Sequence, residues 1–334
     1  MEKWLAGCFF ASVACAPIVA APATACTTEE RELKYGFYAY FEPVSYSEDR
    51  APGAPGFDVH LGYEADLLTA LEAMEGANLS FSRHGIPVWD DIWLLAAGPH
   101  YDIVGGGITV LETRTRDATG RAAIVFTSGH IRFRQSLLVR AADVHELARY
   151  EDLTATTRVG VLAGTTGEAR LLEMTGITDA DGVLVAGTRV ATWEAVVADG
   201  SASYAITAGG ATAALEGRQH LWPPADTMPQ VVYLADEEAL FVALGAGRID
   251  AVAGAEIGNR TGARNGGGAF EVTALDDRAE TGGFALAAAD ERLAACLDRM
   301  IDWLTEGGRI GYREWLEDPA VFLRRARTSD GGER

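Results

Sequence analysis

A turn between a strand and a helix carries residues that suit an anion. The stretch VGVLAGTTGE covers residues 159–168. Its short apolar run ends at Gly164, and helix-forming residues follow Thr165 and Thr166. The first N–H groups of a helix lack backbone partners and carry partial positive charge, and a glycine lets a ligand approach the chain closely. The competing interpretation is a threonine N-cap without a ligand, and this stretch alone leaves both open.

Residue patterns for metal or redox chemistry do not occur in the sequence. There is no CxxC or HExxH pattern and no cluster of histidines with cysteines, so we expect neither a metal ion nor a cofactor.

The net charge of the chain argues against polyanionic partners. The chain has 28 Lys and Arg against 48 Asp and Glu, a net charge of −20, so binding to nucleic acid or to an anionic membrane is not expected. The partner should be a small molecule or a protein.

The N-terminus has the pattern of an export signal. Lys3 precedes an apolar stretch, and small residues lead to Ala23-Thr24-Ala25 just before Cys26. This pattern predicts removal of residues 1–25 as a signal peptide and export to the periplasm. A lipid-modified Cys26 is the alternative, although it requires a larger apolar residue at position 23. No later apolar run reaches the ~20 residues needed to cross a bilayer.

The elements that must position a site alternate between strand and helix. Strands are predicted at 33–40, 79–83, 102–104, 135–140, 159–162, 230–234 and 249–253, and helices at 63–75, 89–97, 236–245 and 290–306, with another starting at 167. This alternation is typical of an α/β protein, and 334 residues suit two domains better than one. The last helix has one apolar stripe and must pack on another part of the chain. Residues 328–334 are polar and are predicted to be disordered.

Five stretches of the chain resemble a known family in kind, order and approximate spacing. They are GFYAYFEPVSY, GFDVHLGYEADLLTALE, WDDIWLLAAGPHYDIVGGGIT, VGVLAGTTGE and GRIDAVAG, within residues 33–315. The chain is here similar to the bacterial extracellular solute-binding proteins of the polar-amino-acid class, which serve ABC importers. The resemblance implies the two-lobed α/β fold of type II periplasmic binding proteins, with the ligand between the lobes. It also implies a membrane permease as partner, and we expect a monomer.

The resemblance divides the chain at two crossings, near Gly129 and Gly283. Lobe 1 would comprise residues 27–129 and 284–323, and lobe 2 would comprise residues 130–283. Lobe 2 contains more chain than the family needs, at about 175–229. Apolar residues alternate there with glycines between them, and this predicts extra strands on lobe 2.

The family pattern places a solute's carboxylate between the two lobes. Thr166 and the amides of the 164–166 turn would meet this carboxylate from lobe 2, which agrees with the donor chemistry of a helix N-terminus. Arg114 on lobe 1 would bind it bidentately, because a guanidinium fork matches a carboxylate, and Thr109 would add a hydroxyl. Neighbouring arginines leave open that Arg114 is a solvated surface residue instead.

The same family pattern predicts ligand contacts for three further residues. The carbonyl of Gly107 would face the ligand's amino group. Phe41 and Trp89 would stack on the body of the ligand, and aromatic faces of this kind also attract cations. Ordinary core packing is the alternative for the two aromatic side chains.

The largest departure from the family lies where an acid normally pairs with the ligand's ammonium group. That acid commonly follows a DAVVG motif directly, whereas here DAVAG is followed by Ala255 and then by Glu256. Either Glu256 reaches in from the next position, or the ligand lacks an ordinary α-ammonium group. A solvent-facing Glu256 is the third interpretation.

These observations predict an exported substrate-binding protein that captures an amino-acid-like or other small carboxylate or zwitterionic solute and delivers it to an ABC importer. The alternative is an enzyme on the same fold, resembling periplasmic cyclohexadienyl dehydratase, which acts on arogenate or prephenate. Such chemistry needs a general acid beside a carboxylate-binding arginine, and Glu256 would be that acid. A second acid of that enzyme's pattern is replaced by Gly258. We therefore expect no catalysis.

Two cysteines remain once residues 1–25 are removed. Cys296 lies at the edge of the apolar stripe of the last helix, which the resemblance returns to lobe 1, and the opening strand of lobe 1 begins just after Cys26. We therefore expect a Cys26–Cys296 disulfide, which an exporting compartment permits. A buried free Cys296 with a lipid-bearing or flexible Cys26 is the alternative.

Overall fold

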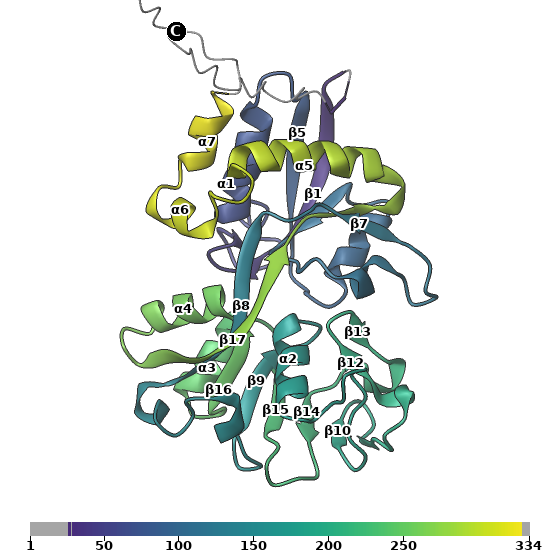
Figure 1. Ribbon diagram of the computed structural model, residues 1–334, viewed down its shortest axis with the longest axis vertical. Coiled ribbons are helices and arrows are strands. Elements are labelled where there is room, and N and C mark those ends of the chain that lie inside the picture. The colour runs from purple at the N-terminus through teal and green to yellow at the C-terminus, as the bar shows by residue number, and fades with distance from the viewer. Residues whose placement is uncertain (1–25, 28, 329–334) are drawn as a thin grey trace, which may run out of the picture.

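The computed structural model describes residues 26, 27 and 29–328. The predicted signal peptide and all but the first residue of the predicted tail lie outside the described residues. The described chain forms two α/β lobes, each built on its own main sheet, as Figure 1 shows. We refer to them by these sheets as the five-stranded lobe and the eight-stranded lobe.

The five-stranded lobe has a mixed sheet covered by helices. Its strands, in spatial order, are β5 (Leu79–Ile86), β1 (Arg31–Tyr38), β6 (Ile103–Gly105), β18 (Ala285–Ala287) and β7 (Ile124–Phe126). Its helices are α1 (Tyr63–Ala73), α5 (Glu291–Thr305), α6 (Tyr312–Glu317) and α7 (Val321–Ala326). A small sheet of β2 (Tyr40–Phe41), β3 (Ser45–Ser47) and β4 (His60–Leu61) adjoins them. The apolar stripe of α5 is buried, so the last helix packs on this lobe as expected.

The eight-stranded lobe carries the helices that begin at the interlobe side. Its strands, in spatial order, are β11 (Val196–Val197), β10 (Arg189–Ala191), β14 (His220–Trp222), β15 (Gln230–Leu234), β9 (Arg158–Leu162), β16 (Ala251–Ala255), β8 (Ile131–Arg140) and β17 (Phe270–Gly282). Its helices are α2 (Thr166–Met174), α3 (Glu237–Gly245) and α4 (Glu256–Asn265). The parallel strands β9, β15 and β16 feed α2, α3 and α4, so all three helix starts face the same edge of the sheet.

Two long strands connect the lobes. β8 and β17 pair in antiparallel fashion, and Figure 1 shows them running side by side from one lobe to the other. Gly282, at the end of β17, is opposite Ile131, at the start of β8. Gly129, two residues before β8, has a φ of +107°. Residues other than glycine adopt this backbone conformation only with strain. The connection therefore consists of two hydrogen-bonded strands with glycines at one end, which suits hinge bending.

The segment 175–229 forms the extra strands that its pattern predicts. Strands β10, β11 and β14 extend the eight-stranded sheet, and β12 (Ile206–Thr207) pairs with β13 (Gly210–Ala211) as a separate hairpin. The segment is also part of the core, since Leu184, Leu215 and Leu221 are buried in one cluster with Leu171 of α2. It is thus packed under α2 rather than attached to the surface.

The predicted disulfide is present between Cys26 and Cys296, whose Cα atoms lie 5.5 Å apart. The bond joins the chain just before β1 to α5, both in the five-stranded lobe. A lipid thioether would need the same Cys26 sulfur, so the structure does not support lipid attachment there. None of the helices in the described part of the chain is long and apolar enough to cross a membrane.

Several elements differ from the sequence prediction. The helix predicted at 89–97 is a short 3-10 helix at Ile92–Ala97, because Asp91 adopts a left-handed conformation with a φ of +53° just before it. The short strands β7 and β18 and the short helix α7 were not predicted. Helix α4 and strand β17 were not predicted either. Both are rich in glycine or charged residues, so neither shows a clear apolar period.

Candidate ligand-binding site

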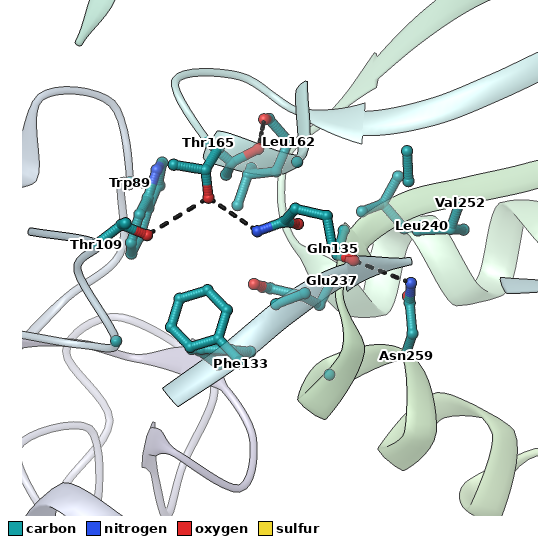
Figure 2. A pocket seen from close by; sticks show the side chains of 18 of the residues that line it. Trp89, Thr109, Phe133, Gln135, Leu162, Thr165, Glu237, Leu240, Val252 and Asn259 are labelled. Atoms are coloured by element: carbon teal, nitrogen blue, oxygen red, sulfur yellow. Dashed lines mark hydrogen bonds between the residues drawn. The ribbon is translucent and has the colours of Figure 1, made fainter. Parts of the chain in front are cut away.

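A cavity lies between the lobes, beside the connecting strand β8. Phe41, Trp89 and Thr109 line it from the five-stranded lobe, and Figure 2 shows it with Thr109 and Gln135 near one end. The cavity offers about 70 Å³ to the centres of water-sized atoms, several times the space that one water molecule needs. It can therefore enclose a small molecule. Its remaining walls come from β9, β16 and the starts of α2, α3 and α4.

The turn before α2 is fixed by buried polar contacts. Gly164 has a φ of +74°, and its N–H donates to the Glu168 carboxylate at 2.7 Å. Thr165 is the N-cap, and its hydroxyl accepts the Glu168 N–H at 3.1 Å. Arg218, from the segment 175–229, donates to both oxygens of Glu168 at 2.8 Å. The extra segment therefore holds the helix start in place through a bidentate buried ion pair.

Three side-chain donors beside this turn converge on a carboxylate of the chain itself. The hydroxyls of Thr166 and Thr109 donate to Oε2 of Glu280 at 2.6 and 3.1 Å, and the amide of Gln135 donates to the same atom at 3.0 Å. The Thr109 and Thr166 hydroxyl oxygens belong to different lobes and lie 3.4 Å apart. The two threonines predicted to receive a solute's carboxylate are thus paired with an internal anion.

An acid occupies the cavity wall near the start of α3. Glu237 is the first residue of this helix, and its carboxylate accepts the Tyr38 hydroxyl from the opposite lobe at 3.2 Å. Burial raises the pKa of Glu237 to about 7, and the charge of Asp236 adds to this, while Tyr38 and Arg50 oppose it. The acids do not form a metal site. Within the described residues no group of three or more His, Cys, Asp or Glu is placed to hold a metal ion.

The predicted aromatic residues and Gly107 lie on the cavity wall. Trp89 is buried and donates its indole N–H to the Gly164 carbonyl at 3.2 Å, across the lobe boundary. Phe41 packs against Gly107, where an added Cβ would come within 2.6 Å of the phenyl ring. The N–H of Gly107 donates to Glu64 at 2.9 Å. Glycine at position 107 therefore lets the ring of Phe41 close one side of the cavity.

Arg114 does not line the cavity, which differs from the predicted arrangement. Its Nε donates to the Ala208 carbonyl at 2.8 Å, and its two terminal nitrogens donate to the carbonyls of Thr109 and Gly164 at 3.2 and 3.1 Å. The guanidinium also lies 4.1 Å from the centre of the Trp93 ring. Because Ala208 is in the β12–β13 turn, the extra segment supplies an acceptor that directs this arginine away from the cavity. Arg114 thereby joins both lobes.

Glu256 begins α4 and forms ion pairs outside the cavity. Its carboxylate accepts Arg260 Nε at 2.7 Å and lies 3.7 Å from Arg134 Nε. The neighbouring Ala255 lines the cavity in its place. Glu256 therefore does not reach into the cavity, and it does not face solvent either, because its side chain is only 18% exposed and is paired with these arginines. Glu237 is the acid at the cavity wall.

Four functional positions were not found from the sequence: Gln135, Arg218, Glu237 and Glu280. A signal existed for Glu237, because it follows a predicted strand and a helix-capping aspartate, where a ligand-facing residue is common in α/β folds. Gln135 lies in a predicted strand, but the pattern does not reveal which face meets the cavity. Arg218 and Glu280 lie in segments without a recognisable period.

Comparison with known proteins bears on the fold. No protein-family model matches the sequence, and neither does any curated protein. Solved structures do match it.

The chain is similar to the ancestral amino acid-binding protein AncCDT-1, a precursor of cyclohexadienyl dehydratase, with 16% identity over 86% of this chain and 94% of that one and a TM-score of 0.56. It is similar to holo ArgBP from T. maritima, with 17% identity over 85% of this chain and 96% of that one and a TM-score of 0.54. It is also similar to the substrate-binding protein AbpA of an amino acid ABC transporter from Streptococcus pneumoniae, bound to L-arginine, with 15% identity over 90% and 97% of the two chains and a TM-score of 0.56. The chain therefore has the two-lobed fold found in these amino-acid-binding proteins.

Proposed function

We propose that this chain is an exported solute-binding protein. It encloses a small solute between its lobes and delivers it, as a monomer in the periplasm, to the permease of an ABC importer. The observation that carries the proposal is the cavity between the lobes, bounded by side chains from both and by the connecting strand β8. The fold shared with amino-acid-binding proteins of ABC transporters supports it.

Contacts across the cavity supply a reason for the lobes to close. Tyr38 and Trp89 of the five-stranded lobe donate hydrogen bonds to Glu237 and to the Gly164 carbonyl of the other lobe. Trp89 and Glu237 line the cavity, and β8 and β17 are paired along the connection between the lobes. A solute that touches both lobes therefore favours the closed arrangement, because binding can stabilise only the conformation with which it interacts better.

The proposal is tested by a thermal-shift screen over amino acids, amines, betaines, ectoines and small organic acids, followed by calorimetry on each compound that raises the melting temperature. A solute present at 100 times its Kd should add roughly 2.7 kcal/mol to the free energy of unfolding. Small-angle scattering should show a smaller radius of gyration with the solute than without it. A screen in which no compound stabilises the protein would overturn the proposal.

The screen includes a test of the enzymatic alternative. The acid first considered for a dehydratase, Glu256, is paired with arginines outside the cavity, and Arg114 donates to backbone carbonyls. These contacts favour binding without turnover. Purified protein incubated with arogenate or prephenate should release no carbon dioxide and form no aromatic product, and steady formation of product would replace the transport proposal with catalysis.

A further inference from the structure

The cavity end nearest α2 is an anion site whose anion comes from the chain. Three donors, from Thr109, Gln135 and Thr166, share Oε2 of Glu280 at 2.6 to 3.1 Å. They come from both lobes and from the connecting strand β8. A carboxylate held by several hydrogen bonds and near a helix N-terminus is well stabilised. Two of these donors, Thr109 and Thr166, are the hydroxyls that the family pattern assigns to a solute's carboxylate.

The strand register explains how Glu280 reaches this position. Glu280 is directly opposite Phe133 in the antiparallel pair of β17 and β8, and residues opposite one another project to the same face of a sheet. Phe133 and Gln135 both line the cavity, so Glu280 stands on the cavity side of the connection. A solute carboxylate at the same donors would face Glu280 at close range, with strong repulsion between like charges. Arg114 donates its hydrogen bonds to three carbonyls. Burial lowers the pKa of Arg114 and the charge of Glu280 opposes this, so the charge of this guanidinium is already balanced by Glu280.

Two further side chains at the wall, Glu237 and Gln135, offer oxygen atoms that can accept hydrogen bonds. Glu237 presents a carboxylate there, and Figure 2 shows it beside Phe133 and Gln135. Within the described residues, Oε1 of Gln135 is buried and has no hydrogen-bond partner. An unpaired buried acceptor is costly, and a donor from a ligand would satisfy it. Phe41 and Trp89 add aromatic faces, which attract cations.

We propose that the cavity selects a small organic cation that bears an ammonium group and no carboxylate, with Glu280 taking the place of the solute's carboxylate. The ammonium group donates to Glu237 and to Oε1 of Gln135, and the carbon skeleton packs on Phe41 and Trp89. This inference rests on the proposed solute-binding function and names its solute class. It departs from the amino-acid-like or carboxylate solutes that the sequence predicts.

The test compares pairs of compounds that differ by one carboxylate. The pairs are isoamylamine and leucine, phenethylamine and phenylalanine, and putrescine and ornithine, each titrated calorimetrically into the full mature protein at neutral pH. For at least one pair the amine should bind about 100-fold more tightly than its amino acid, since the amino acid adds a like charge beside Glu280. An amino acid that binds more tightly than its amine would overturn the inference and leave the solute-binding function standing.

Variants at Glu280 make the test reciprocal. In Glu280→Ala the three donors lose their anion, so the amino acid of the pair should gain at least about tenfold in affinity over its amine, relative to the unmodified protein. Glu280→Gln fills the same space without charge and should not open room for a carboxylate. Asp277→Asn is the control, because Asp277 is exposed on the same strand, and it should leave the preference unchanged.

The outcomes separate the two proposals. If no member of any pair binds the unmodified protein or Glu280→Ala, and no compound of the wider screen binds either, both the solute-binding function and this inference are wrong. If compounds bind but Glu280→Ala does not change the ratio between amine and amino acid, the inference alone is wrong. Should Glu280→Ala fail to fold, the ratio measured on the unmodified protein decides.

Discussion

Of the three helices that begin at the cavity wall, α2 and α3 differ in the chemistry of their first residues. α2 begins with the hydroxyl of Thr166, and its anion is Glu280 from a strand that is distant in sequence. α3 begins with its own acid, Glu237, which is an anion above its pKa of about 7. Both starts carry a side-chain cap, from Thr165 and Asp236 respectively. A helix N-terminus favours an anion. The comparison teaches that the sign of the solute's charge depends on whether the chain has already supplied that anion. Here the chain supplies an acid at the N-termini of both α2 and α3.

The largest expected effect is on stability, and it follows from removing the ion pair between Arg218 and Glu168 that holds the start of α2. Arg218→Met leaves the buried Glu168 carboxylate without its cation, so the free energy of unfolding should fall by about 3–5 kcal/mol. Urea denaturation measures this. Arg189→Met, an exposed arginine of the same segment, should stay within about 1 kcal/mol of the unmodified protein. A loss below about 1 kcal/mol for Arg218→Met would mean that the segment does not hold the α2 start.

Removing the charge of Glu237, at the start of α3, should lower the affinity for the solute rather than the stability of the fold. Glu237→Gln takes away the carboxylate that pairs with the solute's ammonium group, and the affinity for the best amine should fall by about 2–5 kcal/mol. Calorimetry gives the value. Glu238→Gln is the matched control, because that neighbouring side chain is exposed and pairs with Arg50. If both variants bind equally well, Glu237 does not contact the solute.

The pH dependence of amine binding should follow the ionisation of Glu237. Its pKa lies at about 7, above the ordinary value of 4.5, and the protonated form is neutral. An amine that stays charged binds the ionised form, so its affinity should rise by about tenfold per pH unit up to pH 7 and level off above. The free protein should show the opposite trend, losing the Glu237 contribution to stability as pH rises from 4.5 to about 7.

Titrations between pH 5 and 8.5 measure the binding profile, and Glu237→Gln should give a nearly flat one. The groups that act on Glu237 are Tyr38 and Arg50, which lower its pKa, and Asp236, which raises it. A profile that falls with rising pH would exclude a cation bound at this carboxylate.

The smallest effect separates the two helix caps. Thr165→Ala and Asp236→Ala each remove a cap that accepts a backbone N–H, at 3.1 and 2.8 Å, and each should cost about 1 kcal/mol of stability. Only Asp236→Ala should also move the binding profile, because Asp236 raises the pKa of Glu237. Its midpoint should shift to lower pH. A shift in Thr165→Ala as well would indicate that the two ends are electrostatically coupled.

Much of the fold could be predicted because its strands and helices have clear apolar periods. β9 and α2 follow from VGVLAGTTGE, and the buried stripe of α5 follows from its spacing. α4 could not be predicted, because Gly258 and Gly262 lower its helix propensity. Tertiary packing explains these glycines, since an added Cβ at Gly262 would come within 2.7 Å of the Phe241 ring.

The site was less predictable than the fold. The family pattern predicts that Phe41, Trp89 and Thr166 face the ligand, and all three line the cavity. The partners of Arg114 do not follow from it, because Ala208 lies in a segment that the pattern lacks. Glu280 lies in a charged strand whose pairing shifts register twice, so its direction emerges only from the folded structure.

The Cys26–Cys296 bond spans a sequence separation of 270 residues, and the entire eight-stranded lobe lies within the loop it closes. A protease that cuts one exposed turn of that lobe therefore yields two fragments that remain a single molecule until a reductant is added. Non-reducing electrophoresis would show an intact band, and reducing electrophoresis would show two. Because both cysteines belong to one lobe, the same bond leaves the other free to rotate, so the chain is protected against loss of a fragment without being locked shut.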